Sequence, residues 1–351
     1  MLPRSYPVEY RRGLHLPLAG LWLDPRERRD LAVVSHAHGD HIARHRAVVC
    51  TEATYRLMVH RIGAVEPHVL RFGVERAVDG AEGCALSLHP AGHILGAAQV
   101  LVRHAGLRVL YSGDIRTRPS LTCPPLERVE ADVLVVETTF GHQRYRFPHP
   151  DEVIPGVVRF CTDGLAAGEV PVLLAYSLGK AQELLFQLAD SGLRVLLHPV
   201  IHAIACIYRG LGVDLPPAAR LDEEDDLDLF APPQPGGAPS LARRVPRDSV
   251  VVVPPHLRDA RCVRRLAPVR RAALTGWAVD PSTVDRLGCD AAFPLSDHCD
   301  FDDLVAYTLA TRARRVYTIH GFAQDFARHL RSRGVEASAL LEAEQLPLLL
   351  A

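Results

Sequence analysis

Short apolar runs that end at Gly, Asp or Pro follow one another through the first 140 residues of the chain. Leucine-rich and β-branched runs of this length favour strands over helices. They include LHLPLAGLWLDP, LAVVSHAHGD, CALSLHPAGH, AAQVLVRHAG, LRVLYSGD and ADVLVVETTFG. Two of them stop on the polar clusters SHAHGD and SGD, and loops at strand ends commonly carry active residues. We therefore expect a sheet-rich region whose chemistry lies at its strand ends.

The pattern changes near residue 150. EVIPGVVRFCTDGLAAG and GKAQELLFQLADSG have helical apolar spacing, and each ends at a glycine that can cap a helix. The strand-like runs PVLLAY, RVLLHPV and SVVVVPP alternate with them, which indicates a parallel α/β unit. After about residue 290 the strand pattern returns in RRVYTIHG, before the helical FAQDFARHLRSRG.

This order of elements predicts an α/β (α+β) protein of two domains. One domain is discontinuous and comprises residues 1–145 and 291–351, and an α/β domain of residues 146–290 is inserted in it. The chain has 48% hydrophobic and 23% charged residues, which is typical of a globular enzyme or binding protein with a sizeable core.

No apolar run approaches the roughly 20 residues that a membrane helix needs. The first residues, MLPRSYPVEYRRG, lack the layout of a signal peptide. None of the eight cysteines stands in a C-x-x-C pair, which argues against a disulfide framework and against a thiolate zinc site. We expect a cytoplasmic protein that does not associate with membranes.

The charge of the chain is balanced overall but uneven along it. Lys+Arg is 40 and Asp+Glu is 41, which excludes a globally basic binder of nucleic acid but allows a local basic strip. Residues 222–228 carry six acids and no base, whereas residues 243–271 carry nine Arg against two Asp. Two solvated surface segments would explain this polarity. The alternative is that the Arg-rich segment forms one wall of a substrate groove.

The segment SHAHGDH carries the densest candidate chemistry of the chain, namely His36, His38, Asp40 and His41. Imidazole nitrogens and carboxylate oxygens are ligands of zinc and similar ions, and four of them on one turn can surround two adjacent ions. A polar loop that happens to be rich in His is the alternative. Further ligands should then be missing from later strand ends, but His93 in HPAGHILGAAQV and Asp114 in LYSGD follow at such ends.

These motifs, in this order, resemble the ligand motifs of the metallo-β-lactamase superfamily. The resemblance implies an αββα sandwich and two divalent metal ions. It implies that one ion is held by His36, His38 and His93, the other by Asp40 and His41, and that Asp114 bridges them. Imidazole-rich sites favour zinc, while the carboxylates also admit manganese.

Three later residues resemble the additional motifs of the β-CASP nucleases, a branch of that superfamily with an inserted domain. They are Glu137 in VVETTFG, His298 in FPLSDHCDFDDL and His320 in YTIHGFAQDFA. About 160 residues of α/β pattern separate Glu137 from His298, as an inserted domain requires. The resemblance implies that His298 protonates the leaving oxygen with Glu137 as its supporting acid, and that His320 completes the second metal's shell. Asp40 would also orient the attacking hydroxide.

The only lysine of the chain lies in VPVLLAYSLGKAQELLFQL, a strand, a short turn and a helix. A helix N-terminus favours a phosphate, and the turn resembles one of the β-CASP enzymes with Lys in place of Arg. One hypothesis is that Ser177, Gly179 and Lys180 hold a backbone phosphate of the substrate. The other is a helix cap with a solvent-facing lysine.

The segments TGW (275–277), FPLSDHCDFDDL (293–304) and LWLDP are similar to those of bacterial ligase-associated DNA exonucleases. The resemblance implies a DNA exonuclease in DNA repair that prefers DNA over RNA and is functionally associated with a DNA ligase and a helicase. His320 is more typical of RNA-processing members, so an RNA-processing ribonuclease is the alternative. A small-molecule metallo-hydrolase would need neither the insertion nor Glu137 and His298. An inactive scaffold subunit should have lost metal ligands, and none is missing.

Overall fold

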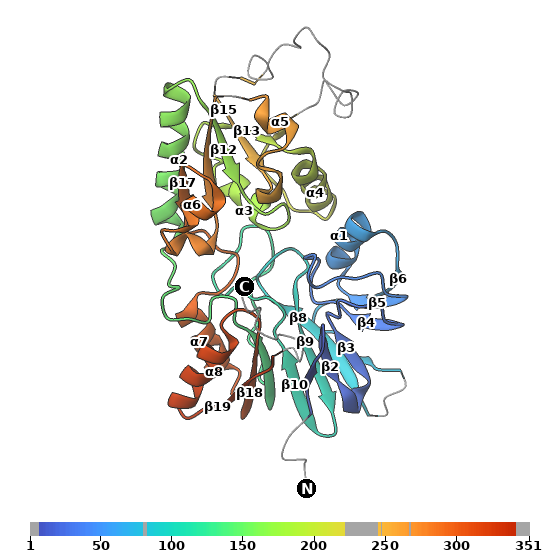
Figure 1. Ribbon diagram of the computed structural model, residues 1–351. Coiled ribbons are helices and arrows are strands. Elements are labelled where there is room, and N and C mark those ends of the chain that lie inside the picture. Colours follow the sequence, from blue (N-terminus) through green and yellow to red (C-terminus); the bar gives the residue numbers. More distant parts are fainter. Residues whose placement is uncertain (1–6, 80–82, 222–244, 247, 267, 342–351) are drawn as a thin grey trace, which may run out of the picture. The chain divides into compact units, whose positions relative to one another are not determined.

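The structure is a computed structural model that describes residues 7–79, 83–221, 245–246, 248–266 and 268–341. The acidic run 222–228 and three arginines of the Arg-rich segment, at positions 243, 244 and 247, lie outside these residues. The chain divides into two compact units (Figure 1). Unit 1 comprises residues 1–146 and 297–351, and unit 2 comprises residues 147–296. Among the described residues, no helix has both the length and the apolarity of a membrane span.

Unit 1 contains two sheets. The first has the order β1-β2-β3-β4-β5-β6. Its strands are β1 (Glu9–Tyr10), β2 (Leu14–Leu16), β3 (Leu21–Leu23), β4 (Leu31–Val33), β5 (Ala47–Cys50) and β6 (Glu66–Val69). The second has the order β19-β18-β11-β10-β9-β8-β7. Its strands are β7 (Arg76–Ala77), β8 (Ala85–Pro90), β9 (Ala98–His104), β10 (Leu107–Tyr111), β11 (Val133–Glu137), β18 (Arg315–Ile319) and β19 (Glu336–Ala339).

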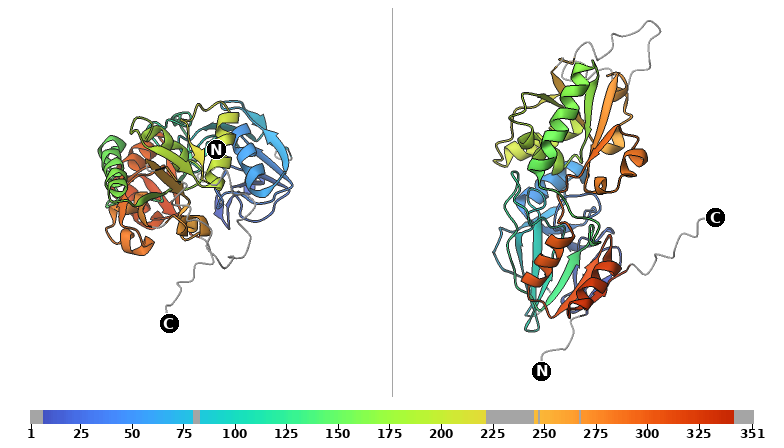
Figure 2. Two further views of the ribbon diagram at one scale, coloured as in Figure 1. Left: turned by 90° about the horizontal axis from the view of Figure 1, so that it is seen from above. Right: turned by 90° about the vertical axis from the view of Figure 1, so that its left-hand side faces the viewer.

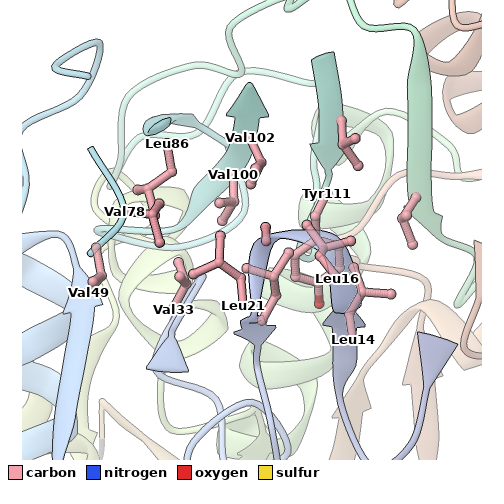
Figure 3. Packing of buried hydrophobic residues seen from close by; sticks show 14 of the residues in the cluster. Leu14, Leu16, Leu21, Val33, Val49, Val78, Leu86, Val100, Val102 and Tyr111 are labelled. Carbon is pink, nitrogen blue, oxygen red and sulfur yellow. The ribbon is translucent and has the colours of Figure 1, made fainter. Parts of the chain in front are cut away.

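The core of unit 1 lies between its two sheets. Leu16, Leu21 and Val33 from the first sheet face Leu86 and Val100 from the second in one buried cluster (Figure 3). These strands come from the leucine-rich and β-branched runs of the sequence, which bury well on a pleated surface. The cluster holds both sheets in place, and the loops at the strand ends are anchored to it.

Helices cover the sheets of unit 1, and two of the three, the first two along the chain, were not predicted. These helices are α1 (Glu52–Ile62), α7 (Phe301–Ala310) and α8 (Ala323–Ser332). Helix α8 packs on β18 and β19, and α1 packs on β6. Helix α1 buries only Thr54, Leu57 and Met58, so its apolar face is too narrow to be recognised from spacing. Its N-terminus is fixed by Thr51, whose side chain accepts a hydrogen bond from the backbone N–H of Thr54.

Unit 2 is a parallel α/β unit, as the alternating pattern predicted. Its sheet has the order β14-β13-β15-β12-β16-β17, and every pair in it is parallel. The strands are β12 (Val170–Leu174), β13 (Arg194–Leu197), β14 (Ala219–Arg220), β15 (Ser249–Val253), β16 (Val269–Leu274) and β17 (Ala291–Phe293). The helices are α2 (Pro150–Ala166), α3 (Lys180–Gln187), α4 (Pro199–Gly210), α5 (Arg261–Arg264) and α6 (Thr283–Leu287).

Helices α2 and α4 lie on opposite sides of this sheet (Figure 1, Figure 2). The strands between them are therefore buried on both faces, which explains their continuous apolar runs. The predicted glycine cap of α3 is wrong, because the helix ends at Gln187 with Leu188 as its C-cap. The glycine after α2, Gly168, does adopt the left-handed conformation, with φ 78°.

Candidate metal centre and active site

The predicted site residues of unit 1 follow the ends of strands in both of its sheets. The segment SHAHGDH follows β4, and the SGD segment follows β10. Strand β11 ends at Glu137, directly opposite Ile319 at the end of β18, and His320 comes next. Because β10, β11 and β18 are parallel neighbours, their carboxyl ends meet at one edge of the sheet. Loops from both sequence segments of unit 1, residues 1–146 and 297–351, therefore converge there.

The loop after β10 approaches the loop after β4 so closely that only glycine fits. Gly113 has φ 54°, and a Cβ atom built on it would lie 2.9 Å from Cβ of Ser35. Because of the left-handed φ and this clash, any other residue at this position would strain the backbone or displace Ser35. The contact sets Asp114 beside the histidines of the SHAHGDH segment.

Four of the predicted ligands form one cluster, which we call the first ligand cluster: His36, His38, His93 and Asp114. Nδ1 of His38 lies 3.1 Å from Nε2 of His36 and 3.1 Å from Nε2 of His93. Oδ2 of Asp114 lies 3.3 Å from Nε2 of His36 and 3.8 Å from Nε2 of His93. Among the described residues, one ligand atom of each member lies within 4.8 Å of those of the others.

The first ligand cluster fits a divalent cation. Nδ1 of His93 donates to the backbone oxygen of Asp297 at 2.8 Å, which leaves the Nε2 lone pair of a neutral ring facing the cluster. Nδ1 of His36 lies 3.0 Å from Oγ of Ser35, whose hydrogen goes to Asp24. Lone pairs therefore converge beside a carboxylate. Tetrahedral ligands at about 2.0–2.1 Å from zinc lie about 3.4 Å apart, close to the separations found here.

The remaining predicted ligands form a looser set beside the first, the second ligand group: Asp40, His41, Asp114 and His320. Nε2 of His41 lies 3.5 Å from Oδ2 of Asp114 and 3.8 Å from Oδ2 of Asp40. The ring centroids of His41 and His320 are 5.8 Å apart. Asp114 is thus shared by both sets, as a bridging ligand would be.

His320 is held in a strained backbone conformation. Its φ is 60°, in the left-handed region that non-glycine residues seldom adopt. Oγ1 of Thr138 donates to its backbone oxygen at 2.6 Å. Gly321 follows with φ 50°, and a Cβ there would lie 2.5 Å from the backbone oxygen of Thr138. Such strain often marks a functional site.

Asp24 is a central residue of the site that the chemistry of the sequence did not reveal. It is 6% exposed, and its Oδ2 accepts hydrogen bonds at 2.8 Å from Nδ1 of His41 and from the hydroxyl of Tyr111. Its Oδ1 accepts the backbone N–H of Ser35 at 2.6 Å. Asp24 therefore fixes the ring of His41 with Nε2 toward Asp114, which is the usual role of a carboxylate behind a metal-binding histidine. The only signal was its place in LWLDP.

Glu137, which is buried, and His298, which is partly buried, form a pair at the edge of the first ligand cluster. Nδ1 of His298 donates to Oε1 of Glu137 at 3.2 Å. Oε2 of the same carboxylate accepts the backbone N–H of Thr139 at 2.7 Å, so both oxygens are held. The ring of His298 lies 4.6 Å from that of His93, centroid to centroid. The structure thus brings two distant motifs together beside the candidate ligands.

Charges divide the histidines of the site into two classes. Against burial, Asp114 and Asp24 raise the pKa of His41 to about 10, and Glu137 raises the pKa of His298 to about 9. Burial and the neighbouring His41 lower the pKa of His36 and bring that of His320 down to about 4. Burial and His298 lower the pKa of His93. His36, His93 and His320 are therefore neutral at pH 7, the form that binds metal.

The predicted phosphate-binding residues belong to unit 2. The backbone N–H of Gly179 donates to Oε1 of Gln182 at 2.8 Å, and Nε2 of Gln182 donates to the backbone oxygen of Ser177 at 3.0 Å. Lys180 is only 7% exposed, and its Nζ donates to the backbone oxygen of Leu295 at 3.0 Å. Of the alternative hypothesis, the helix cap is present, whereas the solvent-facing lysine is wrong.

No family model matches the chain, whereas single proteins do. A protein of Opitutus terrae named "Probable DNA ligase" is 41% identical over 345 residues, which cover 98% of this chain and 32% of that protein. An RNase J-like protein of Methanocaldococcus jannaschii is 27% identical over 182 residues, 44% of this chain and 42% of its own length. The DNA cross-link repair protein SNM1 of Arabidopsis thaliana is 31% identical over 160 residues, 42% of this chain and 32% of its own.

This chain therefore spans about a third of the length of its Opitutus terrae relative. Among solved structures, a protein of unknown function from Enterococcus faecalis V583 is similar in fold, with a TM-score of 0.58. The likeness covers 89% of this chain and 79% of the other, at 13% sequence identity. It concerns the fold alone.

Proposed function

Because the chain belongs to the β-CASP family of the metallo-β-lactamase superfamily, we propose that it is a metal-dependent nuclease that hydrolyses phosphodiester bonds in nucleic acid. Two facing sheets with helices outside them, and a parallel α/β unit within the chain, are what an αββα sandwich with an inserted β-CASP domain requires. The proposal rests on the site, since one fold supports many reactions.

The observation that carries the proposal is the Glu137–His298 pair beside the first ligand cluster. Two divalent ions, zinc or manganese, would supply Lewis-acid activation of water and phosphate. The first ligand cluster would hold one ion and the second ligand group the other. Asp40 would also orient the attacking oxygen. A metal site alone would serve a lactam or thioester hydrolase, which needs no such acid pair.

His298 would act on the leaving group. Cleavage of a phosphodiester expels a sugar oxygen, which is a poor leaving group until it receives a proton. Glu137 holds His298 as imidazolium at neutral pH, because it raises the pKa of that ring to about 9. The imidazolium would give its proton to the leaving oxygen, and the buried carboxylate would stabilise and orient the ring throughout.

We further propose DNA as the substrate and exonucleolytic cleavage in DNA repair as the activity. This finer assignment is supported by the relative named as a DNA ligase, since nearly this whole chain matches one third of that polypeptide. A functional association with a DNA ligase, and with a helicase, belongs to the same proposal. The expected cytoplasmic location stays a prediction.

RNA processing is the second candidate function. It is favoured by His320 and by relatives named as RNase J-like and as endoribonucleases. Both candidates share the metal centre and the acid pair, so the site chemistry does not separate them.

End-labelled single-stranded DNA and RNA of one sequence, cleaved in the presence of manganese or zinc, test both candidates. We expect faster cleavage of DNA into mononucleotides, and the position of the label gives the direction. An Asp40→Ala, His41→Ala double variant is the control for contaminating nucleases. Faster cleavage of RNA would transfer the proposal to RNA processing. No cleavage of either polymer by metal-loaded protein would overturn the nuclease proposal.

We also propose that Ser177, Gly179 and Lys180 bind a backbone phosphate. Lys180 is held near the start of α3, where its own charge and the helix dipole favour an anion. Lys180→Met should weaken binding of single-stranded DNA and reduce the salt dependence of the binding constant. Unchanged binding across a salt titration would contradict this role.

A further inference from the structure

Unit 2 contains a pocket that the proposed chemistry does not use. Its volume is about 340 Å³, and it lies at the carboxyl ends of three neighbouring parallel strands, β15, β12 and β16. Leu174 and Leu274 are the last residues of β12 and β16, and Pro255 follows β15. The direction in which strands are added to the sheet reverses at β12. The strands β13 and β14, which follow β12 in the chain, lie on one side of it, and the later strands β16 and β17 lie on the other. In parallel α/β sheets, ligands bind beyond the carboxyl ends of the strands at such a reversal.

The lining of the pocket combines apolar side chains, two aromatic rings and one cation. Leu174, Leu274 and Leu287 supply apolar surface, and Tyr176 and Trp277 supply the rings. Tyr176 is 51% exposed, so its ring is accessible to a ligand from solution. The TGW segment that marked the resemblance in the sequence thus forms part of this wall.

Hydrogen bonds connect the backbone of Trp277 to the cation of the lining through Thr283. Thr283, which is 1% exposed, donates through Oγ1 to the backbone oxygen of Trp277 at 2.7 Å. Nη2 of Arg286 donates to the same Oγ1 at 2.8 Å. Oγ1 of Thr275 accepts the backbone N–H of Trp277. Among the described carboxylates, none forms an ion pair with Arg286, so its guanidinium can receive an anion from solution.

We propose that this pocket binds one nucleobase of a single-stranded nucleic acid, stacked against Tyr176 or Trp277, with the adjoining phosphate on Arg286. Aromatic side chains beside basic ones are the usual means of holding single strands without reading their sequence. The occupant rests on the proposed function, but the pocket itself belongs to unit 2 and includes no candidate metal ligand. A peptide helix would need a groove for successive anchors, whereas this pocket accommodates a single ring system.

Tryptophan fluorescence isolates the pocket, because the chain has only two Trp residues. Trp22→Phe leaves Trp277 as the sole emitter, and Trp22 itself lies in unit 1, stacked on His15. In this background, with EDTA present so that no cleavage occurs, hexadeoxyadenylate should quench the emission of Trp277. Affinity is measured in parallel by the anisotropy of a labelled hexamer.

We expect Trp277→Leu and Tyr176→Leu each to weaken hexamer binding by about 5–150-fold, the usual effect of removing a stacked ring. Trp277→Phe, which keeps a ring, should retain most of the affinity and so controls for misfolding. Arg286→Gln should weaken binding and lower the slope of log affinity against log salt by about one. Trp22→Phe alone should leave the affinity unchanged.

Absence of quenching, together with unchanged affinity in Trp277→Leu and Tyr176→Leu, would overturn the pocket proposal even if metal-loaded protein cleaves DNA normally. Quenching by the hexamer without any cleavage would sustain it and overturn only the nuclease proposal. Quenching by an apolar helical peptide but not by the hexamer would assign the pocket to a protein partner, against our proposal.

Discussion

Nδ1 of His298 lies 3.2 Å from Oε1 of Glu137, although 161 positions separate the two residues in the chain. Glu137 ends strand β11 and is 1% exposed, and its other oxygen accepts the backbone N–H of Thr139, so the carboxylate is fixed on both sides. In this pair the carboxylate raises the pKa of the imidazole to about 9, so His298 keeps its proton at neutral pH. Two predictions follow from this contact and three from other parts of unit 1.

Replacing His298 should separate catalysis from metal binding. His298→Asn should lower the rate of cleavage by about 10²–10⁴-fold, because the leaving oxygen loses its proton donor. Metal content, measured by elemental analysis of the purified protein, should stay as in the parent. His60→Asn on the exposed surface of α1 is the matched control and should change neither. Loss of metal together with activity would make His298 a ligand instead.

The pH profile should report the Glu137 carboxylate. The protonated ring is the active form, and Glu137 raises its pKa to about 9, so activity should fall as the pH rises through that value. In Glu137→Gln the negative charge is gone, and the fall should occur at lower pH. Cleavage rates at saturating substrate between pH 6 and 10 check this. An alkaline limb at the same pH in both proteins would disprove the link.

Binding of the metal should stabilise the protein through the first ligand cluster. A ligand that binds only the folded state adds about 2.7 kcal/mol when present at 100 times its Kd. Zinc or manganese added to the metal-free protein should therefore raise the Tm, and His36→Ala should remove most of that rise. His89→Gln, in β8 and outside both ligand sets, should keep it. Equal rises in the two variants would contradict the assignment.

Asp24 should increase the metal affinity of the second ligand group through its hydrogen bond to His41. Asp24→Asn removes the charge that orients the ring, and such losses usually cost about 10–100-fold in metal affinity. Tyr111→Phe removes a hydroxyl bonded to the same oxygen but keeps the carboxylate, so its effect should be smaller. Titration of the metal-free variants with zinc in competition with a chelator measures both. Equal affinity in Asp24→Asn and the parent would rule out this positioning role.

The core between the two sheets should dominate the stability of unit 1. Leu88 is 0% exposed in this cluster, so Leu88→Ala should lower the free energy of unfolding by about 2–5 kcal/mol. Leu18 is 50% exposed, and Leu18→Ala should stay within about 0.5 kcal/mol. Urea unfolding followed by circular dichroism compares them. Similar midpoints for the two variants would argue against this core.

The sequence was most informative where a residue's chemistry does not depend on its neighbours. His36, His38, His93 and Asp114 could be picked out as ligands by type and by their place after strand-like runs, and the structure brings them together. The parallel sheet of unit 2 was likewise predicted from the alternation of strand-like and helical runs. Their role in binding metal remains a prediction that the proposed experiments test.

The sequence was least informative where a side chain's role depends on tertiary contacts. Asp24 is a lone acid in the sequence, and its importance appears only when Ser35, His41 and Tyr111 surround it. Lys180 turned inward to the backbone oxygen of Leu295, a direction that helix position alone does not determine. Arg270, counted among the arginines of a possible substrate wall, lies over the ring of Phe160, 4.5 Å from its centroid.

The pairing of β11 with β18 joins two segments of the chain that are synthesised far apart in time. Thr138 donates to the backbone oxygen of Ile319 across 181 positions of sequence. The four members of the first ligand cluster are present in the nascent chain once Asp114 has emerged, whereas Asp297, which fixes the ring of His93, and His298 follow about 180 residues later. At typical rates of translation this interval is roughly 10–40 s. A ribosome-bound chain therefore carries all four members of the first ligand cluster well before it carries the residue proposed to finish the reaction.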